Sequence, residues 1–180
     1  NGGRPQGVLC PFTTRPQKHW PETHWRSLAE TALEQGWRIA VLVAPADRPA
    51  AQRIFTGQAV EDKVGACALD ESAALVSQAS LVIGVDTDLT YMGWAFSVPV
   101  VALFGSTCPY RVVPGRQGHI FYADFRCSLC RRRPTCGGAF DCMSALTPDA
   151  VVVNAAQRYL STESTTAPVL AFSETKEEAL

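Results

Sequence analysis

An acidic turn that follows a short apolar segment is the first candidate for chemistry. Leu81–Val85 form the apolar run, and Asp86, Thr87 and Asp88 follow it directly. The run is typical of a strand buried on both faces of a parallel sheet, and the next residues have helical spacing. Open α/β sheets bind ligands at such strand-to-helix junctions, where free helix amides suit a phosphate. The alternative is that the turn only caps the helix.

The loop after the first apolar segment, residues 7–12, is the second candidate. Thr13 and Thr14 offer hydroxyl and backbone donors, and Lys18 offers a mobile cation that can meet a diphosphate as a point charge. The alternative for Lys18 is a solvated loop lysine. Asp47 follows the second apolar segment, where a Rossmann-like sheet often places an acid on ribose hydroxyls, and a plain surface aspartate is the alternative.

Four cysteines within residues 124–143 form a third candidate site, with the spacing C-x2-C-x5-C-x5-C: Cys127, Cys130, Cys136 and Cys142. Four thiolates can hold zinc or iron tetrahedrally, although the second pair lacks the tight spacing of most zinc ribbons. Reduced or partly oxidised thiols that pack the loop are the alternative. Either role is structural, because a closed four-sulfur site leaves no position for substrate. Arg131, Arg132 and Arg133 suit an anionic acceptor or form a solvated basic loop.

Short apolar strands and amphipathic helices alternate along the chain. Strands are expected at residues 7–12, 38–44, 64–69, 81–85 and 98–104, with an edge strand at 120–123. Helices are expected at 22–35, 49–55, 70–79, 88–96 and 149–160. The alternation predicts one α/β domain over residues 1–160, a Rossmann-like, doubly wound parallel sheet with right-handed crossovers. Residues 161–180, rich in Ser, Thr and Glu, are expected to form a flexible tail.

Composition excludes several classes of protein. Hydrophobic residues make up 47% of the 180 residues and charged residues 18%, which is typical of a globular chain. The net charge of -1 gives no general electrostatic argument for binding nucleic acid or membranes. No apolar run approaches the ~20 residues of a transmembrane helix, and the first residues do not resemble a signal peptide. We therefore expect a cytoplasmic protein, or a fragment of a larger one.

One segment carries a family resemblance. Lys18, Trp20, Pro21, Glu22 and Trp25 form the pattern Lys-x-Trp-Pro-Glu-x-x-Trp. Together with the VDT turn at 85–87, the segment VPVVALFGST at 98–107 and the late cysteine pattern, it resembles the carboxyl-terminal half of the heptosyltransferases of glycosyltransferase family 9. The resemblance covers residues 7–160.

The resemblance implies a GT-B enzyme, in which two Rossmann-like domains face a cleft. Such an enzyme transfers heptose from ADP-heptose to the lipopolysaccharide inner core by an inverting reaction that needs no metal or other cofactor. This chain would be the donor-binding half and inactive alone. The acceptor and a general base would belong to the amino-terminal domain, and the enzyme could contact the inner membrane peripherally.

The resemblance also implies roles for individual residues. Lys18 and Asp86 would be catalytic, Lys18 on the donor phosphates and Asp86 facing the sugar or diphosphate. The other donor-binding residues would be Thr13, Thr14, Asp47, Thr87, Asp88, Leu89 and Thr90. One branch of the family has an iron-binding cysteine finger with a different spacing, so a structural zinc or iron ion is one interpretation of the cysteine cluster.

Two residues depart from the family's central turn. Asp88 replaces a glycine and Tyr91 replaces a histidine. A carboxylate at position 88 would repel a phosphate unless it is paired or turned away. The rival hypothesis is therefore a degenerate, non-catalytic scaffold or oligomerisation module stabilised by a four-cysteine metal site.

Overall fold

A computed structural model describes residues 4–62, 69–107 and 118–151. Within these ranges six strands form one sheet in the order β3-β2-β1-β4-β5-β6, and every neighbouring pair is parallel. The strands are β1 (Gln6–Cys10), β2 (Arg38–Val41), β3 (Glu61–Asp62), β4 (Leu81–Val85), β5 (Val100–Phe104) and β6 (Gly118–Tyr122). The predicted doubly wound α/β fold is confirmed.

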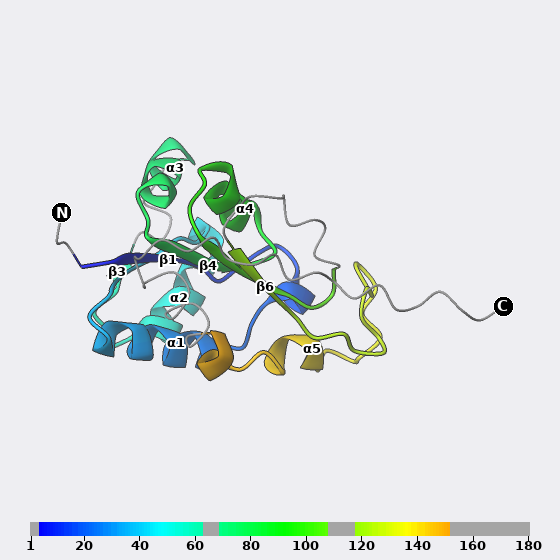
Figure 1. The fold of residues 1–180 in the computed structure, drawn as a ribbon. Coiled ribbons are helices and arrows are strands. Elements are labelled where there is room, and N and C mark those ends of the chain that lie inside the picture. The colour runs from blue at the N-terminus through cyan, green and yellow to red at the C-terminus, as the bar shows by residue number, and fades with distance from the viewer. Residues whose placement is uncertain (1–3, 63–68, 108–117, 152–180) are drawn as a thin grey trace.

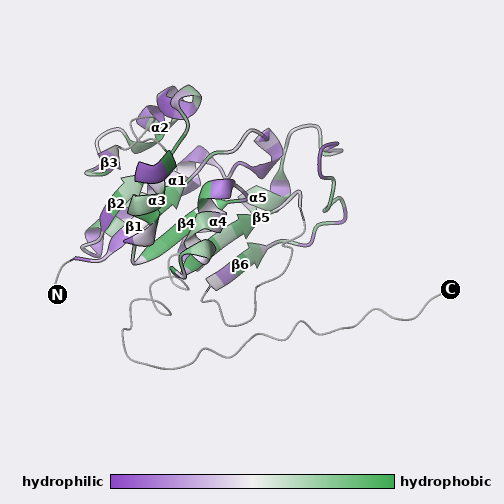
Figure 2. Ribbon diagram, turned by 90° about the horizontal axis from the view of Figure 1, so that it is seen from above, coloured by the Kyte–Doolittle hydropathy of each residue, from purple (hydrophilic) through white to green (hydrophobic). Residues whose placement is uncertain are grey.

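Helices cover both faces of the sheet (Figure 1). One face carries α1 (Glu22–Glu34), α2 (Arg48–Phe55) and α5 (Asp141–Ser144), and the other carries α3 (Leu69–Ser77) and α4 (Asp88–Ala95). Two 3-10 turns, η1 (Pro16–Lys18) and η2 (Pro45–Asp47), follow β1 and β2. Figure 2 shows the central strands as the most hydrophobic part of the chain, in keeping with the complete burial of β4 and β5.

Helix α1 is anchored by aromatic side chains. Trp25 and Leu28 are buried on its inner face, and Gly36, at φ +85°, ends the helix in the left-handed region that favours glycine. The indole of Trp20 packs edge-on against that of Trp25, with ring centroids 4.9 Å apart, and its Nε1–H donates to the Leu146 carbonyl at 2.7 Å. The two tryptophans are therefore core anchors.

Two glycines bring α4 close to the sheet. A Cβ atom at Gly93 would lie 2.6 Å from Val100 Cγ2, so the helix packs backbone-first on β5. A Cβ atom at Gly84 would lie 2.0 Å from Thr90 Oγ1, so β4 needs glycine where the first turn of α4 crosses it. These close approaches fix the position of the turn between β4 and α4.

Several element bounds differ from expectation. The strand expected at 64–69 is represented in the described ranges by β3 at Glu61–Asp62, and residues 63–68 lie outside them. Leu69 instead begins α3, because Asp70 and Glu71 complement the amino end of a helix. The last expected helix is described over residues 148–151, and the expected tail at 161–180 lies outside the described residues. No helix within the described ranges combines the length and hydropathy needed to span a bilayer.

Candidate functional site

Three loops meet at the carboxyl edge of the sheet. Lys18 follows β1, Asp86 follows β4 and Thr107 follows β5, and these three strands are neighbours. Lys18 Nζ lies 2.5 Å from Asp86 Oδ2, and the Thr107 hydroxyl donates to the same oxygen at 2.7 Å. The Tyr91 hydroxyl donates to Asp86 Oδ1 at 3.2 Å. The structure thus joins the two predicted catalytic residues in one network with two hydroxyl groups.

The Lys18–Asp86 pair is partly withdrawn from water. Its side chains are 20% and 12% exposed, so solvent screens this pair less than a fully exposed one. One ammonium proton of Lys18 is enough for Asp86, and a lysine carries three. The remaining donors are available to an anion placed at the edge of the sheet.

Tyr91 replaces the family's histidine without leaving Asp86 unsupported. Burial, and then the neighbouring charge of Asp86, raise the pKa of the Tyr91 phenol to about 12, so it stays protonated and donates. Its ring packs against Trp94, with centroids 5.4 Å apart. The sequence indicated Tyr91 only as a departure, and its contact with Asp86 becomes visible once residues 86–91 are known to form a strand-to-helix turn.

The amino end of α4 lies in this network. Thr87 occupies the N-cap position, and its carbonyl accepts hydrogen bonds from the amides of Thr90 and Tyr91. The Thr87 side chain makes no capping hydrogen bond. The amides of Asp88 and Leu89 lie in the first turn of α4, and a helix offers no backbone acceptor to the N–H groups of its first turn. Asp88 is exposed. An anion at this end of α4 would meet backbone donors close to the Lys18 cation.

Thr90, predicted to bind the donor, is buried beneath the surface of the site. Its side chain is fully buried, and its hydroxyl donates to the Val85 carbonyl at 2.7 Å. The structure therefore gives this side chain a supporting role in the turn and does not bring it to the surface where a substrate would bind.

The Thr13–Thr14 loop is held by His19. The His19 ring donates from Nε2 to the Thr13 carbonyl at 2.7 Å and packs edge-on against Phe12. Thr13 is half-buried and Thr14 is exposed. His19 is thus a structural residue that fixes the predicted phosphate loop just before Lys18.

Asp47 lies at the end of η2, at the carboxyl edge of β2. Strands β1 and β2 are neighbours in the sheet, so Lys18 and Asp47 follow adjacent strands. No ion pair or hydrogen bond within the described ranges joins Asp47 to Lys18 or Asp86. Its predicted ribose contact stays a prediction.

The four clustered cysteines are free thiols. Burial, and then the charges of the other three, raise the pKa of Cys142, whereas hydrogen bonds from the amides of Phe140 and Gly138 lower that of Cys136. The four thiols therefore share one neighbourhood. Even so, the part of the chain that the structure describes has no group of three or more His, Cys, Asp or Glu side chains arranged to hold a metal ion.

The cysteine-rich loop packs against the candidate site. Gln17, which precedes Lys18, is 5% exposed and donates from Nε2 to the Arg131 carbonyl at 2.7 Å. The Arg131 amide donates to the Ser106 carbonyl at 2.9 Å. Gln17 is a positioning residue that the sequence did not indicate, because only the fold brings residue 131 to the first loop.

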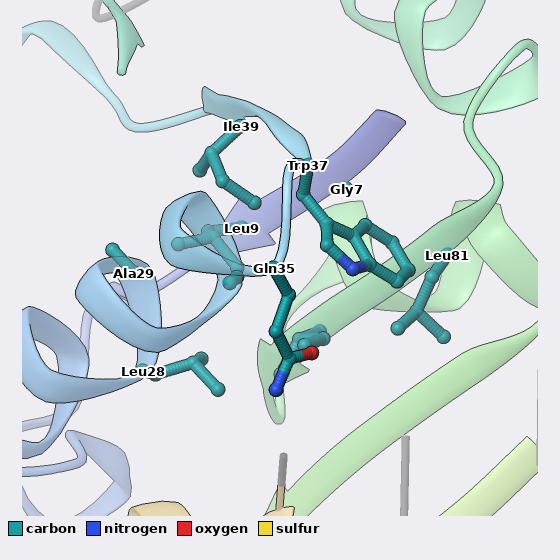
Figure 3. Close-up of a pocket in the computed structure, with 10 residues that line it drawn as sticks. Gly7, Leu9, Leu28, Ala29, Gln35, Trp37, Ile39 and Leu81 are labelled. Atoms are coloured by element: carbon teal, nitrogen blue, oxygen red, sulfur yellow. The ribbon is translucent and has the colours of Figure 1, made fainter. Parts of the chain in front are cut away.

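A separate pocket lies between α1 and the sheet (Figure 3). Leu28, Trp37 and Leu81 line it, and Gly7 borders it near the start of β1. It lies near the amino ends of the strands and has no charged lining residue, so it does not suit a diphosphate.

Comparison with known proteins places the chain in a family. Residues 1–138 match the model of glycosyltransferase family 9 (heptosyltransferase). Lipopolysaccharide heptosyltransferase 1 of Pseudomonas aeruginosa is 34% identical over 136 residues, which cover 74% of this chain and 38% of the relative. The enzyme of the same name from Salmonella typhimurium is 35% identical over 106 residues, 58% of this chain and 33% of the relative.

A solved structure adds to this similarity. Escherichia coli heptosyltransferase WaaC with ADP-2-deoxy-2-fluoro heptose matches with a TM-score of 0.64 and 27% identity, over 84% of this chain and 43% of that one. The chain thus spans well under half the length of these relatives. Because the family model matches residues 1–138, well over half of the chain, the chain belongs to glycosyltransferase family 9, the heptosyltransferases.

Proposed function

We propose that this chain is the donor-binding half of a heptosyltransferase and that its carboxyl edge binds the diphosphate of ADP-heptose. The observation that carries the proposal is the Lys18–Asp86 pair, which lies beside the amino end of α4. A cation and free helix amides at one edge of a parallel sheet form a suitable cradle for a diphosphate. The similarity to a heptosyltransferase solved with an ADP-heptose analogue supports the choice of donor.

Each residue of the site has a distinct part in this proposal. Lys18 meets the diphosphate and stabilises the negative charge that builds on the departing ADP as the sugar bond breaks. Asp86 orients the Lys18 ammonium, and Thr107 and Tyr91 hold Asp86. Further phosphate contacts come from Thr13, Thr14 and the amides of Thr87, Asp88 and Leu89. Asp47 would bind the ribose.

The whole enzyme would carry out an inverting transfer to the lipopolysaccharide inner core. A base outside this chain would deprotonate the acceptor hydroxyl, which then attacks the anomeric carbon. The proposed transfer needs no metal ion, because Lys18 supplies the positive charge that a metal would otherwise bring to the leaving group. The predicted structural zinc or iron ion at the cysteine cluster stays a prediction, because the described residues hold no group of three or more His, Cys, Asp or Glu side chains arranged to bind a metal ion.

Calorimetric titration of the chain with ADP, UDP and GDP tests the donor assignment. Selective binding of ADP is expected. Absence of binding to all three nucleotides would contradict the donor role and favour the rival hypothesis of a non-catalytic scaffold. A thermal shift assay with ADP and with a chelator separates the two further, because a metal-stapled scaffold would respond to the chelator alone.

A further inference from the structure

The main chain of Arg131 is hydrogen-bonded to two loops of the candidate site at once. Its carbonyl accepts a hydrogen bond from Gln17 Nε2 at 2.7 Å, and its amide donates to the Ser106 carbonyl at 2.9 Å. Gln17 directly precedes Lys18 in the loop after β1. Ser106 directly precedes Thr107 in the loop after β5. One residue of the cysteine-rich loop, which joins β6 to α5 and is yellow in Figure 1, therefore connects these two loops.

The same two loops also meet on one oxygen atom. Lys18 Nζ lies 2.5 Å from Asp86 Oδ2, and the Thr107 hydroxyl donates to that oxygen at 2.7 Å. Because β1 and β5 lie on either side of β4, both contacts can exist only while the loops after β1 and β5 keep their spacing. The Arg131 peptide groups bridge that spacing a second time, outside the sheet. The loops are thus joined at two points, at Asp86 and at Arg131.

Arg131 has a backbone conformation that needs support from its surroundings. Its φ is 52°, in the left-handed region that is unfavourable for a residue with a Cβ atom. It lies in a turn, so no helix or strand fixes this conformation. Such strain persists where neighbouring structure imposes it, and two hydrogen bonds to the main chain of Arg131 do so here. Gln17 is only 5% exposed, and this bond offsets the cost of burying its amide.

The far end of the cysteine-rich loop also packs on the chain that follows β5. A Cβ atom at Gly105 would lie 2.7 Å from Cys142 Sγ and 2.7 Å from Met143 Sδ, so α5 contacts the main chain there directly. Both side chains of α5 are buried, and so is Ser106. The cysteine-rich loop is therefore fixed to two consecutive residues, 105 and 106, just before the threonine that donates to the central carboxylate.

We propose that Arg131 is a positioning residue for the donor, and that its main chain clamps the loops after β1 and β5 so that Lys18 and Thr107 stay on Asp86. The inference rests on the proposed function for the identity of the ligand. A hydrogen bond that only stabilised the fold would contribute to ADP binding whether or not Lys18 is present. The clamp instead makes the contribution of Gln17 depend on Lys18, because Gln17 acts through that ammonium group.

Gln17→Met tests the clamp, because methionine has nearly the shape of glutamine but donates no hydrogen bond. In calorimetric titration this variant should bind ADP about three- to tenfold more weakly, the range for the loss of one neutral hydrogen bond. In the Lys18→Ala background the same substitution should change ADP affinity by less than about twofold. Equal losses in both backgrounds would overturn the clamp.

Gln58 provides a matched control. Its Nε2 donates to the Arg26 carbonyl at 2.9 Å, which is also a side-chain bond to a distant main chain, but it lies in the segment that leads into the amino end of β3. Gln58→Met removes the same kind of bond far from the candidate site, so its ADP affinity should change by less than about twofold. A loss as large as that of Gln17→Met would overturn the clamp, because the effect would not be specific to the loops at the carboxyl edge.

Hydrogen exchange tests the clamp without any nucleotide. The Arg131 amide is hydrogen-bonded to the Ser106 carbonyl, and in Gln17→Met its exchange should become at least several-fold faster. Exchange of the Ile83 amide, in the centre of β4, should stay the same. Unchanged exchange at Arg131 would overturn the clamp even in a chain that binds ADP. Faster exchange in a chain that binds no nucleotide would contradict the proposed function and leave the clamp standing.

Discussion

Replacing Lys18 by alanine is the most direct test of the diphosphate site. Lys18 Nζ lies 2.5 Å from Asp86 Oδ2, so the substitution removes a cation and also leaves the Asp86 carboxylate without its charged partner. Both changes oppose the binding of ADP. The fold should persist, because Lys18 is partly exposed and its backbone hydrogen bond to the Arg15 carbonyl does not involve the side chain.

The magnitude follows from the two effects. A hydrogen bond to a charged group contributes about 1.5–3 kcal/mol, which corresponds to roughly a 10- to 100-fold loss of ADP affinity. The unpaired Asp86 adds a repulsion that water screens only in part, because its side chain is 12% exposed. In Lys18→Ala/Asp86→Asn this repulsion is absent, so the double variant should bind ADP more tightly than Lys18→Ala does.

Calorimetric titration of ADP into each variant measures these differences. Arg38→Ala is the control, because it breaks an ion pair with Glu61 of similar length, 2.6 Å, near the opposite edge of the sheet. Its ADP affinity should change by less than twofold, since this pair is exposed and remote from the site. An unchanged affinity in Lys18→Ala would refute the phosphate assignment, and a double variant no better than Lys18→Ala would refute the role given to Asp86.

Other parts of the structure give four more predictions. Tyr91→Phe should weaken ADP binding by less than tenfold in the same titration, because Thr107 and Lys18 still hold Asp86, and a loss as large as that of Lys18→Ala would contradict this. Gly93→Ala should lower the unfolding free energy in urea by about 1–3 kcal/mol, because its Cβ would overlap Val100; an unaltered midpoint would argue against this packing. Burial lowers the pKa of His24 from its ordinary 6.5. Neutral His24 should therefore contribute stability above pH 6.5, and this stability should be lost as the pH falls through the lowered pKa. Urea unfolding at several pH values should show this dependence, and His24→Asn should remove it. The sequence-based prediction of a structural metal ion is tested by adding zinc to the reduced chain: about one bound ion per chain by elemental analysis, with the thiols protected from alkylation, would support it, and unprotected thiols would leave packing as the role of the cysteine cluster.

Most strands and helices can be predicted from the periodicity of apolar residues, whereas the contacts between residues distant in sequence cannot. The apolar run at 81–85 and the helical spacing after it predict β4 and α4, because each depends on neighbouring residues alone. Lys18 and Asp86 were predicted as site residues from their place after strands. Their contact was not predicted, because it requires β1 and β4 to be neighbours in the sheet.

Burial was the harder property to predict at the turn. Thr90 matches the family pattern and was expected to bind substrate, yet it is fully buried over Gly84. A motif records which residue types recur, and it does not separate those that meet a ligand from those that support the backbone beneath it. Gln17 illustrates the converse, because a buried glutamine that holds a distant loop belongs to no recognisable pattern.

The hydrogen bond from the Trp20 indole to the Leu146 carbonyl has a consequence for synthesis of the chain. The donor and acceptor are 126 residues apart, and the indole is buried at 2% exposure. A ribosome that adds 5–20 residues per second needs roughly 6–25 s to cover that distance. Until then the indole N–H has no Leu146 carbonyl to donate to, so burying it without another acceptor would cost free energy. The loop that carries Lys18 therefore acquires its final packing only after every strand of the described sheet has been translated, since β6 ends at Tyr122.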